Sequence, residues 1–304
     1  SSDLYNSVAT AEHAGLAAEE INLTGQLGLL GNGTNLLALH GMNDAASGGD
    51  FLVLAELKEV RVMASTNRYF TAPTPGDFNT GGAFDGFVAD VKYSFDHGFY
   101  DAPITLTLTC ATPGVTLRYT LNGSAPTLAT GFTYTGPLLL TNTTTLRAAA
   151  FRTGLLPSTV QCRTYLFVED IVRQSPTGAA PGPGWPTVSS PAGQIYDYGM
   201  DPDIVNNAAY SADVRLGLKA LPTFSIVADL ADLFDPTTGI YANPRSDERA
   251  WERPCSLEMV FPDGREGFQI NCGVRVRGGF SRDPANPKHA FRLFFRQDYG
   301  ESTL

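Results

Sequence analysis

Apolar and polar residues alternate along several short runs between residues 93 and 168. The clearest run covers residues 104–110, and a second covers residues 115–120. Strict alternation of this kind is typical of strands with one buried face. Pro113-Gly114 and Asn122-Gly123 supply turns around these runs. Short strands separated by closely spaced turns predict an immunoglobulin-like β-sandwich over residues 93–168.

The first 65 residues show a sparser strand pattern. Apolar residues recur over residues 21–29, and strand-like runs follow at residues 35–41 and 51–54. Residues 33–39 resemble the late strand of galactose-binding-like jelly rolls. Because so few strands cannot close a core alone, we expect residues 1–65 to be the C-terminal part of a sandwich that begins upstream.

Segments rich in proline and glycine separate the predicted modules. Residues 66–92 and residues 169–214 both contain such breakers, the second with a Pro-Gly-Pro-Gly run at residues 181–184. We interpret both segments as linkers, and we expect a short polar helix near residues 203–216 within the second.

Residues 215–304 form the last predicted module. A strand is expected over residues 223–228, followed by a short helix that Asp229 caps and that ends at Phe234. Asp263-Gly264 marks the turn of a hairpin beyond it.

The register of this hairpin follows from its turn. It places Cys255 opposite Cys272, with two further apolar pairs, Leu257 with Ile270 and Met259 with Phe268, on the same face. We therefore predict a disulfide between Cys255 and Cys272, the alternative being two buried thiols. The pairing of Cys110 and Cys162 does not follow from the pattern.

Composition and charge narrow the function classes. The net charge is −10 and the isoelectric point about 4.8, which argues against a nucleic-acid partner. No apolar run is long enough to span a membrane, and no signal peptide is visible. The chain starts at Ser1 without a methionine and ends at Leu304 after a strand-like run, so we expect both ends to be cut. No C-x-x-C motif or Cys/His cluster indicates a metal site.

A basic stretch at residues 275–296 contrasts with the acidic chain. It holds six basic residues and one acidic residue, a net charge of +5. Glycines at a strand end let backbone N–H groups approach an oxyanion. This pattern predicts an anion site with the following candidate residues: Arg277, Gly278, Gly279, Ser281, Arg282 and Lys288. The alternative is a solvated strand pair in which arginines alternate with apolar residues.

The run Tyr119-Thr120-Leu121-Asn122-Gly123-Ser124-Ala125-Pro126-Thr127 resembles the signature of the chitobiase/β-hexosaminidase C-terminal-type sandwich. The resemblance covers about 75 residues and continues through Tyr134, Leu146 and Tyr165. It implies an accessory module rather than a catalytic domain. Asn122 stands where the signature usually has an aspartate, so no metal is assigned to this turn.

Residues 196–304 resemble the spore-coat protein H (CotH) kinase-like family. The motifs are Tyr198-Gly199-Met200-Asp201-Pro202, Leu221-Pro222-Thr223-Phe224-Ser225-Ile226, Gly239-Ile240-Tyr241, Trp251-Glu252-Arg253-Pro254, the run 273–282, the run 287–293 and Tyr299-Gly300, in the order of the family. The resemblance implies an atypical protein kinase of Ser/Thr in surface proteins, with ATP and Mg²⁺ as cofactors. It implies that Lys288 and the turn 277–282 lie near the phosphates. The catalytic residues of the family are expected downstream of Leu304, so none is assigned here.

Together these patterns predict a multidomain, mainly β chain. Partial jelly-roll-like strands precede an immunoglobulin-like β-sandwich, and the truncated α+β N-lobe of a kinase-like domain follows. We expect a fragment of a secreted or cell-surface protein whose partner is a surface-protein substrate or a polysaccharide. The alternative function is a surface adhesion or carbohydrate-binding scaffold in which the kinase-like domain is structural.

Overall fold

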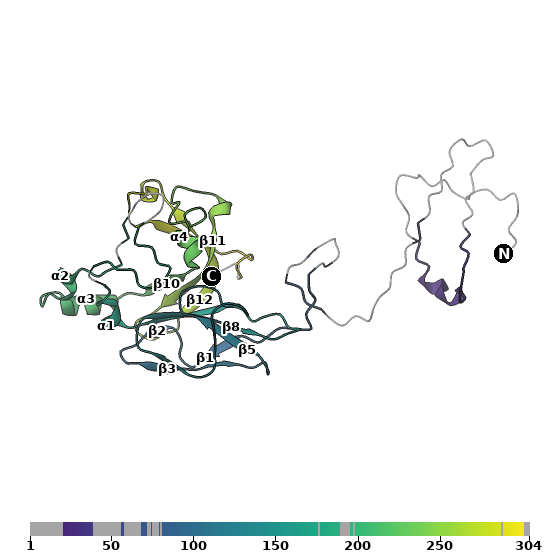
Figure 1. The fold of residues 1–304 in the computed structure, drawn as a ribbon, viewed down its shortest axis with the longest axis horizontal. Helices are drawn as coiled ribbons and strands as arrows, with labels where there is room; N and C mark the ends of the chain where they lie inside the picture. The colour runs from purple at the N-terminus through teal and green to yellow at the C-terminus, as the bar shows by residue number, and fades with distance from the viewer. Residues whose placement is uncertain are drawn as a thin grey trace. The chain divides into compact units, whose positions relative to one another are not determined.

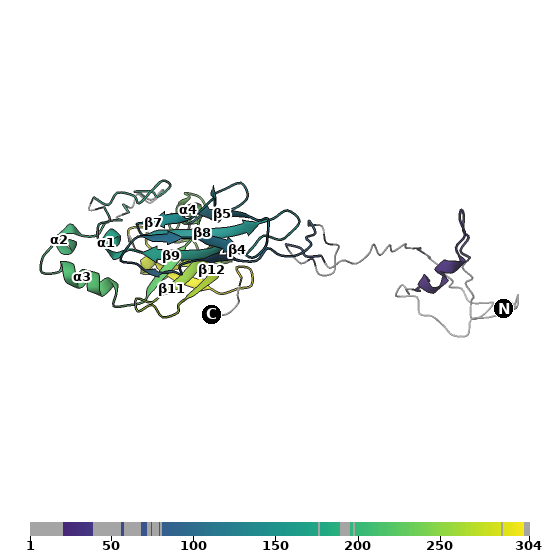
Figure 2. The ribbon, with the colours of Figure 1, turned by 90° about the horizontal axis from the view of Figure 1, so that it is seen from below.

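The chain divides into two units, residues 1–65 and residues 66–304. The computed structural model describes residues 21–38, 56–57, 68–71, 74, 79, 81–175, 177–188, 195–196, 198–286 and 288–300. Figures 1 and 2 show the second unit as layers of strands with short helices at its margins. The mainly β architecture that the alternation predicted is confirmed for this unit.

The described part of the first unit contains a short 3-10 helix, η1 (Thr24–Leu29), and no strand. The strand predicted over residues 35–41 is wrong for residues 35–38. The Asn35 side chain accepts a hydrogen bond from Gly31 N at 2.8 Å and donates to Gly31 O at 3.0 Å. These local bonds stabilise a turn that includes Asn35, the first residue of the predicted strand. Residues 39–41 and the run 51–54 lie outside the described residues.

A five-stranded sheet forms one face of the sandwich in the second unit, in the order β2-β9-β8-β5-β6. Its strands are β2 (Gly98–Phe99), β9 (Gln161–Leu166), β8 (Thr144–Phe151), β5 (Thr116–Thr120) and β6 (Phe132–Thr133). β2 is parallel to β9, and the other pairs are antiparallel.

Two short ribbons form the other face of the sandwich. β1 (Val91–Tyr93) pairs with β4 (Leu108–Cys110), and β3 (Ile104–Leu106) pairs with β7 (Leu138–Leu140). The run 104–110, predicted as one strand, changes partner at Thr107, whose N–H and carbonyl both bond Ser94. Leu106 and Leu108 nevertheless both reach the core that fills the sandwich, because the alternation continues through Thr107.

The sandwich extends upstream into the segment predicted as a linker. Phe87 forms a parallel bridge with Leu156, and Val88 is buried in the core. Between residues 168 and 218 lie three short helices, α1 (Val168–Ile171), α2 (Pro202–Val205) and α3 (Ser211–Leu218), which share a small apolar cluster at one end of the unit (Figures 1 and 2). α2 and α3 fall where one short helix was predicted.

The C-terminal sheet has the order β10-β11-β12-β13. Its strands are β10 (Thr223–Val227), β11 (Arg253–Val260), β12 (Phe268–Arg277) and β13 (Ala290–Phe294). The predicted hairpin register is confirmed, with Cys255 opposite Cys272, Leu257 opposite Ile270 and Met259 opposite Phe268. α4 (Leu230–Phe234) follows Asp229 as predicted, although the Asp229 side chain makes no capping bond.

The C-terminal sheet packs through β11 and β12 on β9, which makes the five-stranded sheet a middle layer. This arrangement explains why Ala148, Ala149 and Ala150 are all fully buried, although successive residues of a strand point to opposite faces. The polar face of the β11–β12 hairpin lies in this interface, and Ser256 and Glu258 on it are fully buried. The alternation of the hairpin marks that face as polar and gives no sign that it lies between two sheets.

The sandwich turn that carries the chitobiase-type signature also touches the C-terminal module. Gly123 has φ of +84°, and a Cβ there would lie 2.8 Å from Ala228 O. Asn122 Oδ1 accepts from the N–H and hydroxyl of Ser124 at 3.1 and 2.7 Å. Asn122 therefore shapes the turn, and Gly123 permits the close contact between the two modules.

Candidate functional site

The basic stretch lies on the ladder between β12 and β13. Arg275 is opposite Arg292, and Arg277 is opposite Ala290. Val274 and Val276, on the other face of β12, are buried in the core of the C-terminal sheet. Because strand residues alternate between faces and opposed residues share one, the three arginines lie on one face of the sheet, away from that core.

Two cations of the stretch are neutralised by one aspartate. Asp247 Oδ1 lies 3.5 Å from Arg275 Nη2, and Asp247 Oδ2 lies 3.0 Å from Arg282 Nη1. The N–H of Glu248, which donates to Asp247, and then the two guanidinium groups hold the pKa of Asp247 below its usual value. Arg275 also stacks over the Phe294 ring at 4.9 Å. Arg282, a predicted anion ligand, is therefore engaged by a carboxylate.

The turn after β12 depends on its first glycine only. Gly278 has φ of +114°, and a Cβ there would lie 2.0 Å from Ser281 Oγ. Ser281 donates its hydroxyl hydrogen to Arg277 O at 2.9 Å, so this predicted anion donor instead closes the turn. A Cβ on Gly279 would have no other atom within 4 Å. The backbone beside Gly279 is therefore open to approach.

The loop between η3 (Phe280–Arg282) and β13 is held by its own polar groups. Asp283 accepts from Ala285 N and from Arg245 at 2.9 Å each, which hold the pKa of Asp283 below its usual value. Asn286 donates to Phe280 O at 2.8 Å. His289 is buried, and its Nδ1 donates to Ser281 O at 2.6 Å. His289 thus fixes the chain next to Lys288 against the turn.

Three cations of the stretch are exposed and have no acidic partner among the residues that the structure describes: Arg277, Lys288 and Arg292. Arg277 and Arg292 are diagonal neighbours across the ladder. Lys288 precedes Ala290, which is opposite Arg277, by two residues. The arrangement is a surface of unpaired positive charge around an open glycine turn, which can attract an anion.

Two residues of this site were not identified from the sequence pattern. Asp247 lies 28 residues before Arg275 in the chain, and no motif joins them. Arg292 was counted in the basic stretch and was not proposed as a ligand. Among the described residues no group of three His, Cys, Asp or Glu side chains could hold a metal ion.

The four cysteines carry free thiols, which corrects the predicted disulfide. Cys255 Sγ and Cys272 Sγ lie 3.5 Å apart and share a hydrogen bond. That bond and burial raise the pKa of Cys255. Cys110 Sγ donates to Ala89 O at 3.1 Å, and Cys162 is buried at the interface between the sheets.

Residues 95–162 match the family model of the chitobiase/beta-hexosaminidase C-terminal domain. The chain therefore contains this immunoglobulin-like domain, as the signature at residues 119–127 predicted. The match ends before the C-terminal sheet begins. No curated protein and no solved structure matches the chain. Within the described residues no helix has the length and apolar character needed to cross a membrane.

Proposed function

We propose that this chain belongs to a modular secreted or cell-surface protein whose C-terminal module binds the phosphates of ATP. One observation carries the proposal. Arg277, Lys288 and Arg292 have no acidic partner among the described residues, and they lie on or just before the two strands, β12 and β13, that the segment with the open glycine turn connects, in a chain of net charge −10. Unpaired cations beside an open glycine turn are the chemistry that polyphosphates require.

The resemblance of residues 196–304 to the CotH kinase-like family supports the choice of ATP among phosphate ligands. Under this proposal Arg277 and Lys288 contact phosphate oxygens, and the backbone at Gly279 approaches them. Gly278 and Ser281 shape the turn, and Arg282 exchanges Asp247 for phosphate when the nucleotide binds. Phosphoryl transfer to Ser or Thr of surface proteins is the activity that this resemblance implies for the complete protein.

Titration calorimetry of the 304-residue chain with ATP and Mg²⁺ tests the proposal. Replacing Lys288 by alanine removes a charge-assisted contact worth about 1.5–3 kcal/mol, so affinity should fall roughly tenfold or more. Lys92→Ala is the matched control, because Lys92 is an exposed lysine on β1. Inorganic triphosphate should compete with ATP, and adenosine should not. Equal ATP affinity in wild type and Lys288→Ala would refute the role of Lys288.

A second candidate is a surface scaffold that binds carbohydrate. The match of residues 95–162 to a domain named after chitobiase and β-hexosaminidase favours it. In that case the basic turn is a solvated strand end, and ATP should bind no better than another trianion of similar size.

A further inference from the structure

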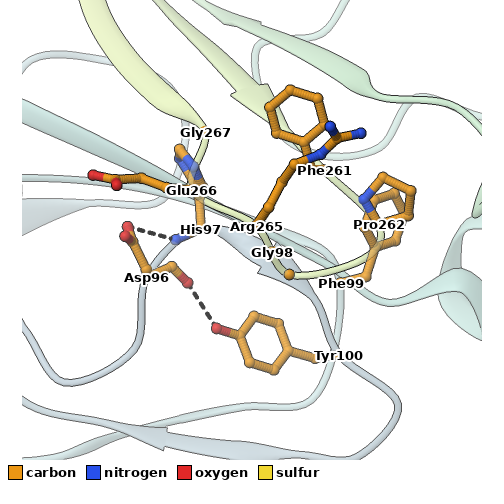
Figure 3. A pocket seen from close by; sticks show the side chains of 11 residues that line it. Asp96, His97, Gly98, Phe99, Tyr100, Phe261, Pro262, Arg265, Glu266 and Gly267 are labelled. Carbon is orange, nitrogen blue, oxygen red and sulfur yellow. Dashed lines mark hydrogen bonds between the residues drawn. The ribbon is translucent and has the colours of Figure 1, made fainter.

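A cavity of about 260 Å³ lies between the two modules of the second unit, and no residue of the basic turn lines it. One wall is the sandwich segment 96–100, which contains β2. The other wall is the turn of the β11–β12 hairpin, residues 261–267. Figure 3 shows side chains from both walls around a shared opening. Neither resemblance assigned a role to these residues.

The two walls are held at a fixed separation. His97 Nδ1 lies 2.9 Å from Glu258 Oε1, and Glu258 is fully buried on β11. Asp96 accepts from His97 N at 2.9 Å and from Arg163 at 2.7 Å. The Tyr100 hydroxyl donates to Asp96 O at 2.7 Å (Figure 3). The bond of His97 to Glu258 joins the sandwich wall to the strand that leads into the hairpin turn, and the other bonds hold the sandwich wall in its conformation. The cavity is therefore preformed. Preformed pockets avoid the cost of ordering their walls.

The cavity is lined by aromatic rings together with positively and negatively charged side chains that can form hydrogen bonds. Phe99, Tyr100 and Phe261 are half-buried and line the cavity. Arg265 stacks over the Phe261 ring at 4.2 Å, with the guanidinium at the opening (Figure 3). Glu266 is exposed beside it. Ring faces suit the C–H face of a sugar, and carboxylates and a guanidinium suit its hydroxyl groups.

Most charged side chains around the cavity are paired, and the buried Glu258 carboxylate is bonded to His97. Arg163 is paired with Asp96, and Arg265 lies 3.3 Å from Asp263. Glu266 adds one negative charge in solvent, where it is screened. An anionic ligand would find no surplus cation here, and a cationic ligand would meet Arg265 at the opening. Carboxylate acceptors outnumber free donors, which fits a ligand rich in hydroxyl donors.

We propose that this cavity binds one uncharged sugar ring, free or as a residue of a polysaccharide. Its volume falls just below the range of about 300–1,000 Å³ typical of pockets for drug-sized ligands, so it suits a single ring. The proposal does not depend on the ATP site. It gives the carbohydrate-binding alternative a definite location, at the junction of the modules instead of on an exposed sandwich face.

Saturation-transfer and amide chemical-shift NMR on the 304-residue chain test this proposal. The probes are D-glucose, D-galactose and N-acetyl-D-glucosamine, each up to about 10 mM, which detects a Kd of about 1 mM. Binding should shift amides in residues 96–100 and 261–267. Arg265→Ala and Glu266→Ala should each weaken binding about tenfold, because each removes a charge-assisted hydrogen bond. Both side chains are exposed, so the fold should persist.

Lys92→Ala and Asp213→Ala are the matched controls, because both residues are exposed and neither lines the cavity; they should bind sugar as the wild type does. Glucuronate and arginine methyl ester serve as anionic and cationic competitors and should not bind. The proposal is overturned if no neutral sugar binds at about 10 mM, if Arg265→Ala and Glu266→Ala bind normally, or if a charged competitor binds instead. ATP affinity should be unchanged in Arg265→Ala, which separates this test from that of the phosphate site.

Discussion

Thr164 on β9 donates its hydroxyl hydrogen to Glu258 Oε2 on β11 across 2.5 Å, although 94 residues separate the two in the chain. The Thr164 N–H also donates to Glu258 Oε1 at 3.2 Å, and His97 completes the set. A buried carboxylate is tolerated only when its oxygens are hydrogen-bonded. This pair therefore ties the sandwich to the C-terminal sheet.

Thr164→Val should destabilise the second unit. The change leaves a buried carboxylate oxygen without its hydroxyl donor, which costs roughly 1–3 kcal/mol. Urea unfolding measures the free energy, and Thr105→Val, at an exposed site on β3, is the matched control. A Thr164→Val protein as stable as wild type would mean that Glu258 does not depend on this bond.

The two glycines of the basic turn should respond differently to alanine. Gly278→Ala forces a side chain into φ of +114° and against Ser281 Oγ, so it should cost about 1–3 kcal/mol. Gly279→Ala meets nothing within 4 Å and should change stability by less than about 0.5 kcal/mol. Thermal unfolding compares the two variants directly. Equal losses would contradict the geometry of the turn.

Glu248→Gly should stabilise the protein. Glu248 has φ of +69° and ψ of −179°, a region that costs a residue other than glycine about 1–3 kcal/mol. The gain, measured as a rise in Tm, should be about 1 kcal/mol after the extra freedom of glycine in the unfolded chain is subtracted. Glu248→Ala removes the same carboxylate and keeps the strained backbone, so it should show no gain. If both variants were more stable than wild type, the cause would be the loss of the Glu248 carboxylate and not the relief of backbone strain.

Acid should release the arginines that Asp247 holds. The pKa of Asp247 is lower in the folded protein than its usual 3.8. Its stabilisation is therefore fully present above pH 3.8 and is lost as the pH falls through the lower folded value. Asp247→Asn should be less stable than wild type near neutral pH, and the difference should shrink as the pH falls below 3.8 and close once the folded protein is protonated at Asp247. A difference that is constant with pH would point to packing instead of ionisation.

Mild oxidation should join Cys255 to Cys272. Their Sγ atoms are 3.5 Å apart at opposed positions of the hairpin, so a small movement brings them to bonding distance. The bridge should add about 2 kcal/mol, because the loop that it closes is short. Before oxidation both thiols should resist alkylation in the folded protein, since they are buried. Non-reducing peptide mapping decides the pairing, and links of either cysteine to Cys162 would contradict it.

Local pattern predicted the hairpin well and its surroundings poorly. The register of Cys255 with Cys272 followed from one turn and the alternation on each side, both of which are contained in about twenty residues. The change of pairing strand at Thr107 could not be predicted from the sequence, because apolar and polar residues alternate in the same way on both sides of Thr107. The contacts of Glu258 with Thr164 and of Asp247 with Arg282 join distant segments, and a single sequence holds no signal for such pairs.

The candidate site was predicted in outline for the same reason. Arg277, Gly278 and Ser281 lie within five consecutive residues, so their common turn could be foreseen. Which cations remain unpaired depends on where Asp247 lies, and that follows from the packing of the loop before β11. The sugar cavity was not foreseen at all, because each wall comes from a different module.

The middle position of the β8–β9 sheet has a practical consequence for protein engineering. Cutting the chain at the boundaries of the matched domain, residues 95–162, would remove β1 and most of β9 and would bring Ala149 and Cys162 from full burial into water. The excised piece would expose an apolar sheet face to solvent, and it would self-associate through that face. Anyone who wishes to graft this sandwich into another protein should either move it together with the β10–β13 sheet or first redesign its outer face with charged residues.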